Sequence, residues 1–385
     1  MKLRGRLLLH GELVVGELSL VGDRIGTIER TIAEVADPSA LPVIAPGLID
    51  LHIHGFGGCD PLDDLAGMAR SLARAGTTAF QPTLFPRDPE RLGQDVVAVD
   101  RQAQAAAGQS GLARSMGVHL EGPFLNPRAA GAIPVADLAT PSVDSLRAIL
   151  GSPSGSGRGV QRMTIAPELT GSPDLVEELL RCGVRVSLGH SRTTARDARS
   201  ALARGATGVT HLFNAMGPLH HREVGLAGVA LTDAAAFAEI IGDLTHVGRD
   251  AIDLALTARG PAGLCLVSDA LKGAGTGCDV FHWHGRDHVV QGNTAYYPAQ
   301  EEGGSLQLAG SACSQLEMVR TLTAGGVVGL ADALAMASAT PARALGLEGE
   351  IGVLASGARA DLIVLKGDQL DLAEVWVAGQ RCLPD

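Results

Sequence analysis

The chain has 385 residues, of which 46% are hydrophobic, 19% charged and 3% aromatic, with a net charge of −11. This composition is typical of a soluble α/β protein, long enough for two average domains or one large barrel with an appendage. The acidic balance argues against nucleic acid or an anionic membrane as a partner. The sequence contains no run of about 18 apolar residues and no signal-peptide pattern, so we expect a cytoplasmic protein.

Short β-type runs with glycine turns occupy both ends of the chain. Neither end buries much alone, so we expect residues 1–46 and 347–385 to pair into one small β-sandwich domain. Between them, in residues 47–346, apolar runs alternate with helical patterns. This alternation is typical of βα units around a parallel sheet.

The central region contains eight apolar runs that we expect to be strands, at 48–54, 76–82, 116–121, 162–167, 184–190, 207–211, 237–242 and 263–269. Helices are expected at 61–75, 88–107, 172–182, 194–204 and 248–258, an irregular polar stretch at 271–310, and further helices at 312–324 and 330–345. Residues 151–159 are expected to be a flexible loop. Eight parallel strands predict a (β/α)8 barrel with its active site at the carboxyl ends of the strands.

The first expected strand ends in two histidines one residue apart. Alternate side chains of a strand share a face, so Asp50, His52 and His54 point one way and Leu51 and Ile53 the other. At a spacing of about 6–7 Å along the strand, the two imidazoles can converge on one metal ion. The alternative is a pair of polar residues facing solvent, and His-x-His alone favours a metal only modestly.

The other expected strands end in the same kind of residue. Metal-ligating or acid–base side chains follow strands three, five, six, seven and eight: Glu121, His190, His211, His246 and Asp269. Imidazoles and carboxylates are the ligands of zinc, iron and related divalent ions. Any one of these residues alone is more often structural, but their joint occurrence at one rim indicates a metal centre. The six cysteines are scattered without a C-x-x-C pair, which argues against a disulfide framework or a thiolate zinc site.

Several segments resemble a known family: PGLIDLHIHG, HLEGPFLNP, VSLGHS, THLFNAMGPLHHREVGLAG, LVSDA and the tail GEIGVLASGARADLIVL. In these the chain is similar to the N-acetylglucosamine-6-phosphate deacetylases of the amidohydrolase superfamily. The resemblance implies that Glu121, His190 and His211 bind one divalent ion and that His52 and His54 complete a second site. It also implies that Asp269 is the catalytic aspartate. One or two ions per subunit are expected, and the ligand types fit Zn, Fe, Mn or Co.

The near absence of lysine separates the chain from part of that superfamily. Many members bridge two ions with a carbamylated lysine on the fourth strand. No lysine lies between Lys2 and Lys272, so that arrangement is excluded and Glu121 is the expected bridge.

The implied reaction is hydrolysis of the acetyl amide of N-acetylglucosamine 6-phosphate, giving acetate and glucosamine 6-phosphate. A bound divalent ion lowers the pKa of its water from 15.7 to about 7 and polarises the amide carbonyl. Asp269 is expected to take the proton from this water and to return it to the leaving amine.

The resemblance also implies substrate-binding residues: Asn214, Ala215, Arg222, His246, Ala132 and His221. In the family the arginine matching Arg222 reaches the phosphate from a neighbouring subunit, which implies a homodimer. Without this match, a solvated loop charge would be the preferred interpretation of Arg222.

Two positions depart from the family pattern. Ile133 stands where a polar side chain helps to hold the acyl carbonyl, and Leu244 replaces a glycine close to His246. Another N-acyl substrate is therefore an alternative, such as N-acetylgalactosamine 6-phosphate or an unphosphorylated amide. A further alternative is a barrel without catalytic activity.

The remaining histidines are expected to be inert: His10, His119, His282, His284 and His288. Among these, His119 is expected to face away from Glu121. The resemblance implies a β-hairpin at FHWHGRDH, so the histidines of the 271–310 stretch are expected to be exposed.

Overall fold

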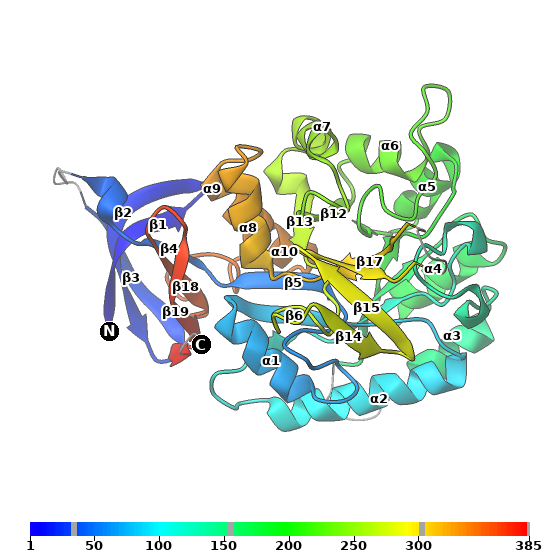
Figure 1. Cartoon of the computed structure of the whole chain (residues 1–385), viewed down its shortest axis with the longest axis horizontal. Coiled ribbons are helices and arrows are strands. Elements are labelled where there is room, and N and C mark those ends of the chain that lie inside the picture. Colours follow the sequence, from blue (N-terminus) through cyan, green and yellow to red (C-terminus); the bar gives the residue numbers. More distant parts are fainter. Residues whose placement is uncertain (32–36, 152–157, 300–304, 383–385) are drawn as a thin grey trace.

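The computed structural model describes residues 1–31, 37–151, 158–299 and 305–382. Figure 1 shows a small sheet containing both chain ends beside a larger body in which helices surround a ring of strands. The predicted (β/α)8 barrel with a small β domain is confirmed. Within the described ranges, no helix is both long and apolar enough to cross a membrane. The loop expected at 151–159 falls mostly outside these ranges.

The barrel is a ring of parallel strands in the order β5-β6-β8-β9-β10-β11-β12-β13. Their bounds are β5 Leu48–Ile53, β6 Thr77–Leu84, β8 Val118–Glu121, β9 Val160–Ile165, β10 Arg185–Leu188, β11 Gly208–Val209, β12 Phe237–Ile241 and β13 Leu264–Val267, and the short β7, Arg114–Ser115, pairs with β6. Between the first and last strands, the amide of Asp269 donates to the carbonyl of His52 at 2.9 Å. Each predicted strand is present, shortened or shifted by a few residues.

The helices around the barrel are α1 Leu65–Arg74, α2 Pro89–Ala106, α3 Val143–Leu150, α4 Ser172–Arg181, α5 Ala195–Ala203, α6 Gly225–Thr232, α7 Arg249–Arg259 and α8 Gln315–Ala324. Side-chain caps set several starts: Asp64 accepts from Gly67, Asp88 from Glu90 and Thr194 from Asp197. Helices α3 and α6 were not predicted. Almost all of α6 is buried, so its sequence lacks the polar face that marks an amphipathic helix.

The single helix expected at 330–345 is in fact two, α9 Leu330–Met336 and α10 Ala339–Ala344. Pro341 has no amide hydrogen to donate to the carbonyl of Ala337, four residues earlier. That carbonyl instead accepts the amide of Ile49 on β5 at 2.8 Å. The break therefore ties the helical layer to the first barrel strand.

The small domain is one sheet of seven strands in the order β20-β19-β18-β4-β1-β2-β3. The strands are β1 Lys2–Leu9, β2 Glu12–Val21, β3 Arg24–Arg30, β4 Val43–Pro46, β18 Leu362–Lys366, β19 Asp371–Val377 and β20 Gln380–Cys382. Its two halves join where β4 pairs antiparallel with β18. Alternate residues face two cores: Leu7 and Ile44 pack in the domain's own cluster, whereas Leu8 and Val43 pack against the barrel.

The stretch at 271–310 was expected to be irregular apart from a β-hairpin at FHWHGRDH; the hairpin is present, but the described part of the stretch is more regular than expected. It contains β14 Val280–Trp283, β15 Arg286–Gln291, β16 Thr294–Tyr297 and β17 Gln307–Ser311, which form an antiparallel sheet. Figure 1 shows these strands in yellow in front of the barrel. The amide of Ser311 on β17 donates to the carbonyl of Asp269 at 2.9 Å, so this sheet is anchored beside the last barrel strand.

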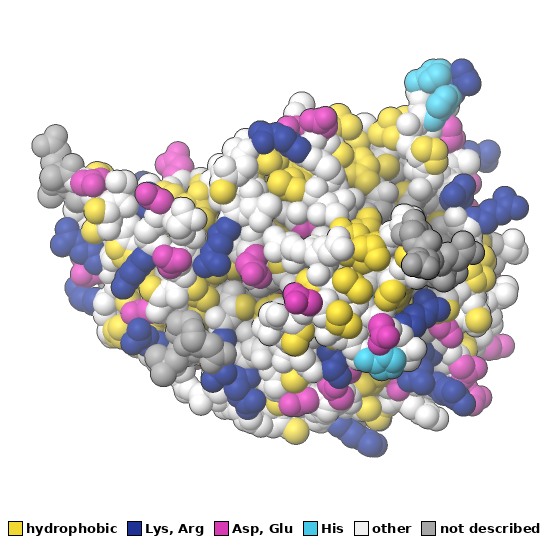
Figure 2. Space-filling model, viewed as in Figure 1, with side chains coloured by type: hydrophobic (Ala, Val, Ile, Leu, Met, Phe, Trp, Pro, Cys, Tyr) yellow, Lys and Arg dark blue, Asp and Glu magenta, His cyan; other side chains and the backbone are white. Residues whose placement is uncertain are grey.

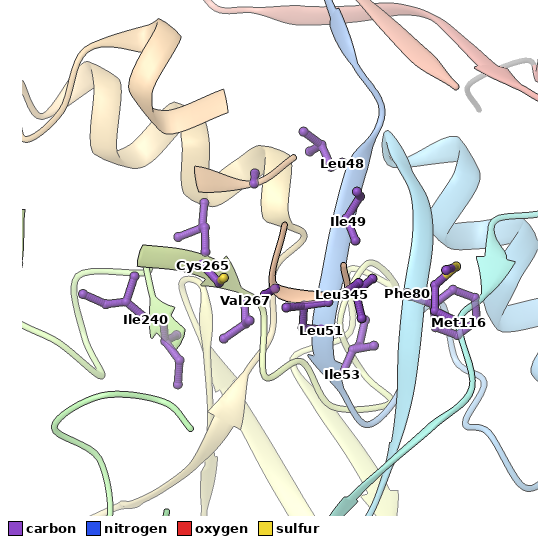
Figure 3. Packing of buried hydrophobic residues seen from close by; sticks show 14 of the residues in the cluster. Leu48, Ile49, Leu51, Ile53, Phe80, Met116, Ile240, Cys265, Val267 and Leu345 are labelled. Carbon is purple, nitrogen blue, oxygen red and sulfur yellow. The ribbon is translucent and has the colours of Figure 1, made fainter. Parts of the chain in front are cut away.

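The outward faces of the barrel strands make the main apolar core. Figure 3 shows Leu51 and Ile53 of β5 among neighbours that include Val267 and Leu345. Because side chains alternate along β5, this packing turns His52 toward the inside of the ring, as predicted.

Candidate metal centre

His52 and His54 lie together at the carboxyl end of β5. Both are fully buried, at 0% and 1% exposure, and their Nε2 atoms are 3.2 Å apart. The geometry therefore brings two ring nitrogens to one point inside the barrel mouth.

Glu121, the last residue of β8, lies between two pairs of histidines. Its Oε1 is 2.9 Å from the Nε2 atoms of both His190 and His211, which are themselves 3.0 Å apart. Its Oε2 is 3.3 Å from the Nε2 of His54. Two groups that could each hold a metal ion, one with His52 and His54 and one with His190 and His211, thus share this carboxylate.

Hydrogen bonds on the far side of two rings orient them for metal binding. The Nδ1 of His190 lies 2.9 Å from the carbonyl of Ala129, to which it donates, and the Nδ1 of His52 lies 3.2 Å from the Glu239 carboxylate. A neutral imidazole that donates from Nδ1 keeps a lone pair on Nε2. These Nε2 atoms face the shared carboxylate, so the donor set fits a divalent ion.

Asp269 adjoins the His52 and His54 side of the cluster. Its Oδ1 lies 3.5 Å and 3.4 Å from their Nε2 atoms, and its side chain is 15% exposed, more than those of the other members. Burial opposes ionisation of this carboxyl, but the nearby imidazoles of His52 and His54 outweigh it and lower the pKa of Asp269. An ionised carboxylate therefore stands at the open side of the cluster.

The charged groups of the cluster shift one another's pKa values. Burial disfavours the Glu121 carboxylate, yet the adjacent His52 and His190 hold its pKa well below the usual range. For His54 burial opposes the charge, but Asp269 and Glu121 outweigh it and raise the pKa to about 9. Burial likewise opposes the charge of His211, and Glu121 raises its pKa to about 9. The site thus has a strong affinity for positive charge.

Three cluster residues have left-handed backbone conformations. The φ angles are 46° at His190, 30° at His211 and 48° at Asp269. Such conformations cost non-glycine residues free energy, of the order of 1–3 kcal/mol in sparsely populated regions, and concentrate at functional sites. Each turns a side chain inward just after its strand ends.

Glu239 and Arg162 support the cluster and were missed by the sequence analysis. Both are buried, with Arg162 Nη1 2.8 Å from Glu239 Oε1, while the other carboxylate oxygen faces His52. A carboxylate behind a ligating histidine fixes the ring and its tautomer. The signal was present: Glu239 is a lone charge within the apolar run FAEII on β12.

His119 does not face away from Glu121, so that expectation is wrong. The two residues are two positions apart on β8 and so share a face. His119 is fully buried, with Nε2 2.8 Å from the Thr164 hydroxyl and Nδ1 3.1 Å from the Leu51 carbonyl. Both nitrogens are engaged, so its role is structural although it lies near His52 and Glu239.

The loops after β11 and β12 carry all the predicted substrate-binding residues except Ala132, which lies in the segment after β8. Asn214 lies three residues after His211 and its amide donates to the His211 carbonyl at 2.9 Å, and Ala215 borders Gly131, the neighbour of Ala132. His246 is held by Asp243, whose Oδ2 lies 2.7 Å from its Nδ1, and Leu244 adopts a left-handed φ of 62° between them. These residues lie in loops that begin at the same rim as the cluster.

Arg222 and His221 are not brought to the cluster. Both are exposed, with Arg222 Nη1 3.0 Å from His221 Nε2, on a loop where His220 and Glu223 form an isolated bridge. This loop projects beyond α5 and α6 in Figure 1, and Figure 2 shows histidine and basic side chains at its tip.

A hollow of about 280 Å³, here called the aromatic hollow, opens beside His54. Its apolar lining comes from several segments far apart in the chain and includes Leu84, Phe85, Ile133, Leu271, Trp283 and Tyr297. Phe85 stacks on the His54 ring at 3.7 Å between centroids. His284 and His288 also line it, and the exposure expected for His288 is wrong: it is 2% exposed and stacks on Phe281.

Comparison with known proteins shows the family to which the chain belongs. Residues 43–382 match the model of the amidohydrolase family. The chain belongs to this family. It is 35% identical to the human N-acetylglucosamine-6-phosphate deacetylase, over 98% of this chain and 93% of that protein. It is 33% identical to the N-acetylgalactosamine-6-phosphate deacetylase of Escherichia coli O157:H7, over 98% of each.

Solved structures agree with this assignment. A mutant N-acetyl-D-glucosamine-6-phosphate deacetylase from Mycobacterium smegmatis, in complex with N-acetyl-D-glucosamine-6-phosphate, superimposes with a TM-score of 0.86 at 31% identity, covering 100% of this chain and 99% of that one. The amidohydrolase family implies a divalent metal, and the shared-carboxylate cluster supplies suitable ligands.

Proposed function

We propose that the protein is a metal-dependent hydrolase that removes the acetyl group from N-acetylglucosamine 6-phosphate, giving glucosamine 6-phosphate and acetate. The observation that carries the proposal is the meeting of His52, His54, Glu121, His190 and His211 around one carboxylate, with Asp269 beside them. The names and coverage of the relatives support the choice of substrate.

The proposed metal ligands divide into two sets. Glu121, His190 and His211 would hold one divalent ion, and His52 and His54 together with Glu121 would hold a second. When bound, a divalent ion polarises the amide carbonyl and favours ionisation of water. The Glu239 carboxylate and the Ala129 carbonyl keep His52 and His190 in the orientation that this requires.

Asp269 performs the proton transfers in this proposal. Its lowered pKa keeps it ionised, so its Oδ1 accepts a proton from the attacking water. Water oxygen adds to the carbonyl carbon, the C–N bond breaks, and the proton passes from Asp269 to the leaving nitrogen. Without this transfer the amine would leave as a strongly basic anion.

The substrate is proposed to lie with its phosphate toward the loop after β11. Asn214 and Ala215 contact the phosphate, His246 and Ala132 border the sugar, and His221 and Arg222 complete the phosphate site of a second copy of the chain. Exposure of Arg222 on a projecting loop supports this exchange between subunits. Sedimentation analysis should show a dimer, and a fully active monomer would contradict the exchange.

N-acetylgalactosamine 6-phosphate is the second candidate substrate. The relative from Escherichia coli O157:H7 with that name covers this chain as completely as the human relative does. Leu244, two residues before His246, stands where the family pattern has a glycine, and we propose that its side chain alters the shape of the sugar site.

A panel of N-acetyl hexosamines, with and without the 6-phosphate, scored for acetate release, tests the proposal. We expect the highest kcat/KM for N-acetylglucosamine 6-phosphate. A higher value for the galactosamine isomer would select the second candidate. No acetate from any member, with metal present in the protein, would overturn the proposed function.

A further inference from the structure

The aromatic hollow lies on the opposite side of the metal cluster from the proposed phosphate site. Thr83 and Phe85, which line it, belong to the end of β6 and the loop that follows. Asn214 and Ala215 follow β11, and β6 and β11 are four strands apart in the ring of eight, which places them across the barrel from each other. A substrate with its phosphate at β11 and its amide over the cluster therefore directs its acyl group toward the hollow.

The hollow is much larger than an acetyl methyl group requires. Its volume is about 280 Å³. About 10–15 Å³ of the same kind of volume is enough for one water molecule, which is comparable in size to a methyl group. Its walls combine apolar with polar side chains, and on the apolar side Leu271 and Trp283 form a small cluster with Phe85 and Ala309 packed against it.

Several charged groups that line the hollow have partners, and Asp137 lies at its edge. Asp60 accepts from Trp283 Nε1 at 2.9 Å and lies 3.3 Å from Lys272 Nζ, and Arg87 pairs with Asp95 at 2.7 Å. The guanidinium of Arg286 lies over the ring of Tyr297. His284 is exposed as a residue, but packing of its ring against Trp283 and Phe85 removes water from it and lowers its pKa, which favours the neutral form. The hollow thus suits an uncharged apolar group better than a phosphate.

Ile133 connects this hollow to the chemistry. It is 6% exposed and lies in the lining together with Ala132 and His54. In this position a branched aliphatic side chain offers dispersion contacts and no hydrogen bond.

We propose that the aromatic hollow is an acyl-chain pocket and that the enzyme removes acyl groups longer than acetyl, such as butyryl, at least as efficiently as acetyl. This inference rests on the proposed hydrolysis of an N-acyl amino sugar phosphate. It makes Phe85, Ile133 and Trp283 determinants of acyl-chain specificity.

The test is a series of N-acetyl, N-propionyl and N-butyryl glucosamine 6-phosphates, with release of free amine measured on the unmodified, metal-loaded protein. We expect kcat/KM for the butyryl compound to equal or exceed that for the acetyl compound. A hydrophobic pocket changes kcat/KM by about tenfold or more per methylene. A tenfold preference for acetyl over butyryl would overturn the acyl pocket while leaving the proposed function standing. No hydrolysis of any member would overturn the proposed function itself.

A pair of matched substitutions tests whether the hollow determines the preference for acyl-chain length. Ile133→Phe narrows the hollow, and Val135→Phe makes a similar enlargement two residues away at a side chain that is 55% exposed. We expect Ile133→Phe to lower the butyryl-to-acetyl ratio of kcat/KM by about tenfold and Val135→Phe to leave it unchanged. A ratio unaffected by Ile133→Phe in folded, metal-loaded protein would show that the hollow holds another part of the substrate.

Discussion

The barrel mouth and the small β domain use buried side chains in opposite ways. At the mouth, carboxylates and imidazoles are packed within about 3 Å of one another, and His190, His211 and Asp269 have left-handed backbones. In the small domain, the enclosed cluster is built from apolar side chains such as Leu18, and left-handed residues lie in turns such as His10 and Gly11.

This difference indicates that the side chains at the barrel mouth serve catalysis and those of the small domain serve stability. Buried charges and strained backbones lower stability and persist because they are useful at a site. Buried apolar side chains stabilise the fold in proportion to the area they remove from water. Changes at the mouth should therefore abolish activity with the fold retained, and changes in the small domain should do the reverse.

Removal of the metal should have the largest effect. Exhaustive chelation is expected to reduce hydrolysis to background and to lower the melting temperature, because an ion that binds only the folded state stabilises it. Metal analysis, activity and thermal unfolding before and after chelation would measure this. Restoration of both properties by added Zn²⁺, Mn²⁺, Fe²⁺ or Co²⁺ is the control. Full activity in protein verified to be metal-free would contradict the role of the cluster.

Asp269→Asn should lower kcat by about 10²–10⁴-fold, the range in which a general acid–base group contributes. The amide is close in shape to the carboxylate but cannot accept the proton from water. Metal content and melting temperature should remain near those of the unmodified protein. Loss of metal in this variant would instead assign Asp269 a ligand role.

Leu18→Ala should lower the stability of the fold and leave kcat unchanged, the opposite of Asp269→Asn. Leu18 on β2 is 0% exposed within the small domain's cluster, so the truncation leaves a cavity and should cost about 2–5 kcal/mol of unfolding free energy. Denaturant unfolding measures the loss, and kcat per folded molecule should be unchanged. Val21→Ala is the matched control, because Val21 is 66% exposed on the same strand. A fall in kcat with Leu18→Ala would show that the two regions are coupled.

Arg222→Ala tests the projecting loop. If Arg222 binds the phosphate, kcat/KM for N-acetylglucosamine 6-phosphate should fall by about 10- to 100-fold, as expected for loss of a hydrogen bond to a charged group. Turnover of N-acetylglucosamine without phosphate should not change. Equal values for the variant and the unmodified protein on the phosphosugar would assign Arg222 to solvent.

Glu178→Gln should have the smallest effect. Hydrogen bonds from Arg181 and Arg147 lower the pKa of Glu178 to about 2 from its ordinary value of 4.5. The ionised form therefore stabilises the fold above about pH 4.5, and this stabilisation is lost as the pH falls toward 2. At pH 7 the variant's melting temperature should fall by about 1 °C or less, since both arginines that pair with the largely buried Glu178 are exposed and water screens the ion pairs. The difference should shrink as the pH approaches 3, and a constant difference would contradict the ionic cause.

The strand ends could be found from the sequence because of two local regularities. Apolar runs mark buried parallel strands, and all such strands end at one rim of a barrel, so the ligand-type residues that follow them meet there. The same alternation rule places His119 on the face of Glu121, and the contrary expectation misapplied it. The break near Pro341 was also readable, because proline removes a helical hydrogen bond.

Other features depend on contacts between distant segments. Glu239 pairs with Arg162, 77 residues away in the chain, and supports His52, 187 residues away. The aromatic hollow combines Phe85, Ile133 and Trp283 from three separate loops and strands. The spacing of residues along the chain does not predict such long-range contacts.

By itself the sequence determined the alternating elements, the apolar faces of the strands and the residue types at the barrel mouth, because these follow from side-chain periodicity and ligand chemistry. Only the tertiary structure decided which nitrogens face Glu121, which carboxylate stands behind His52, and that a large apolar hollow adjoins His54. The physical reason is that closure of the barrel sets the distances between strand ends, and those distances decide what the side chains can bind.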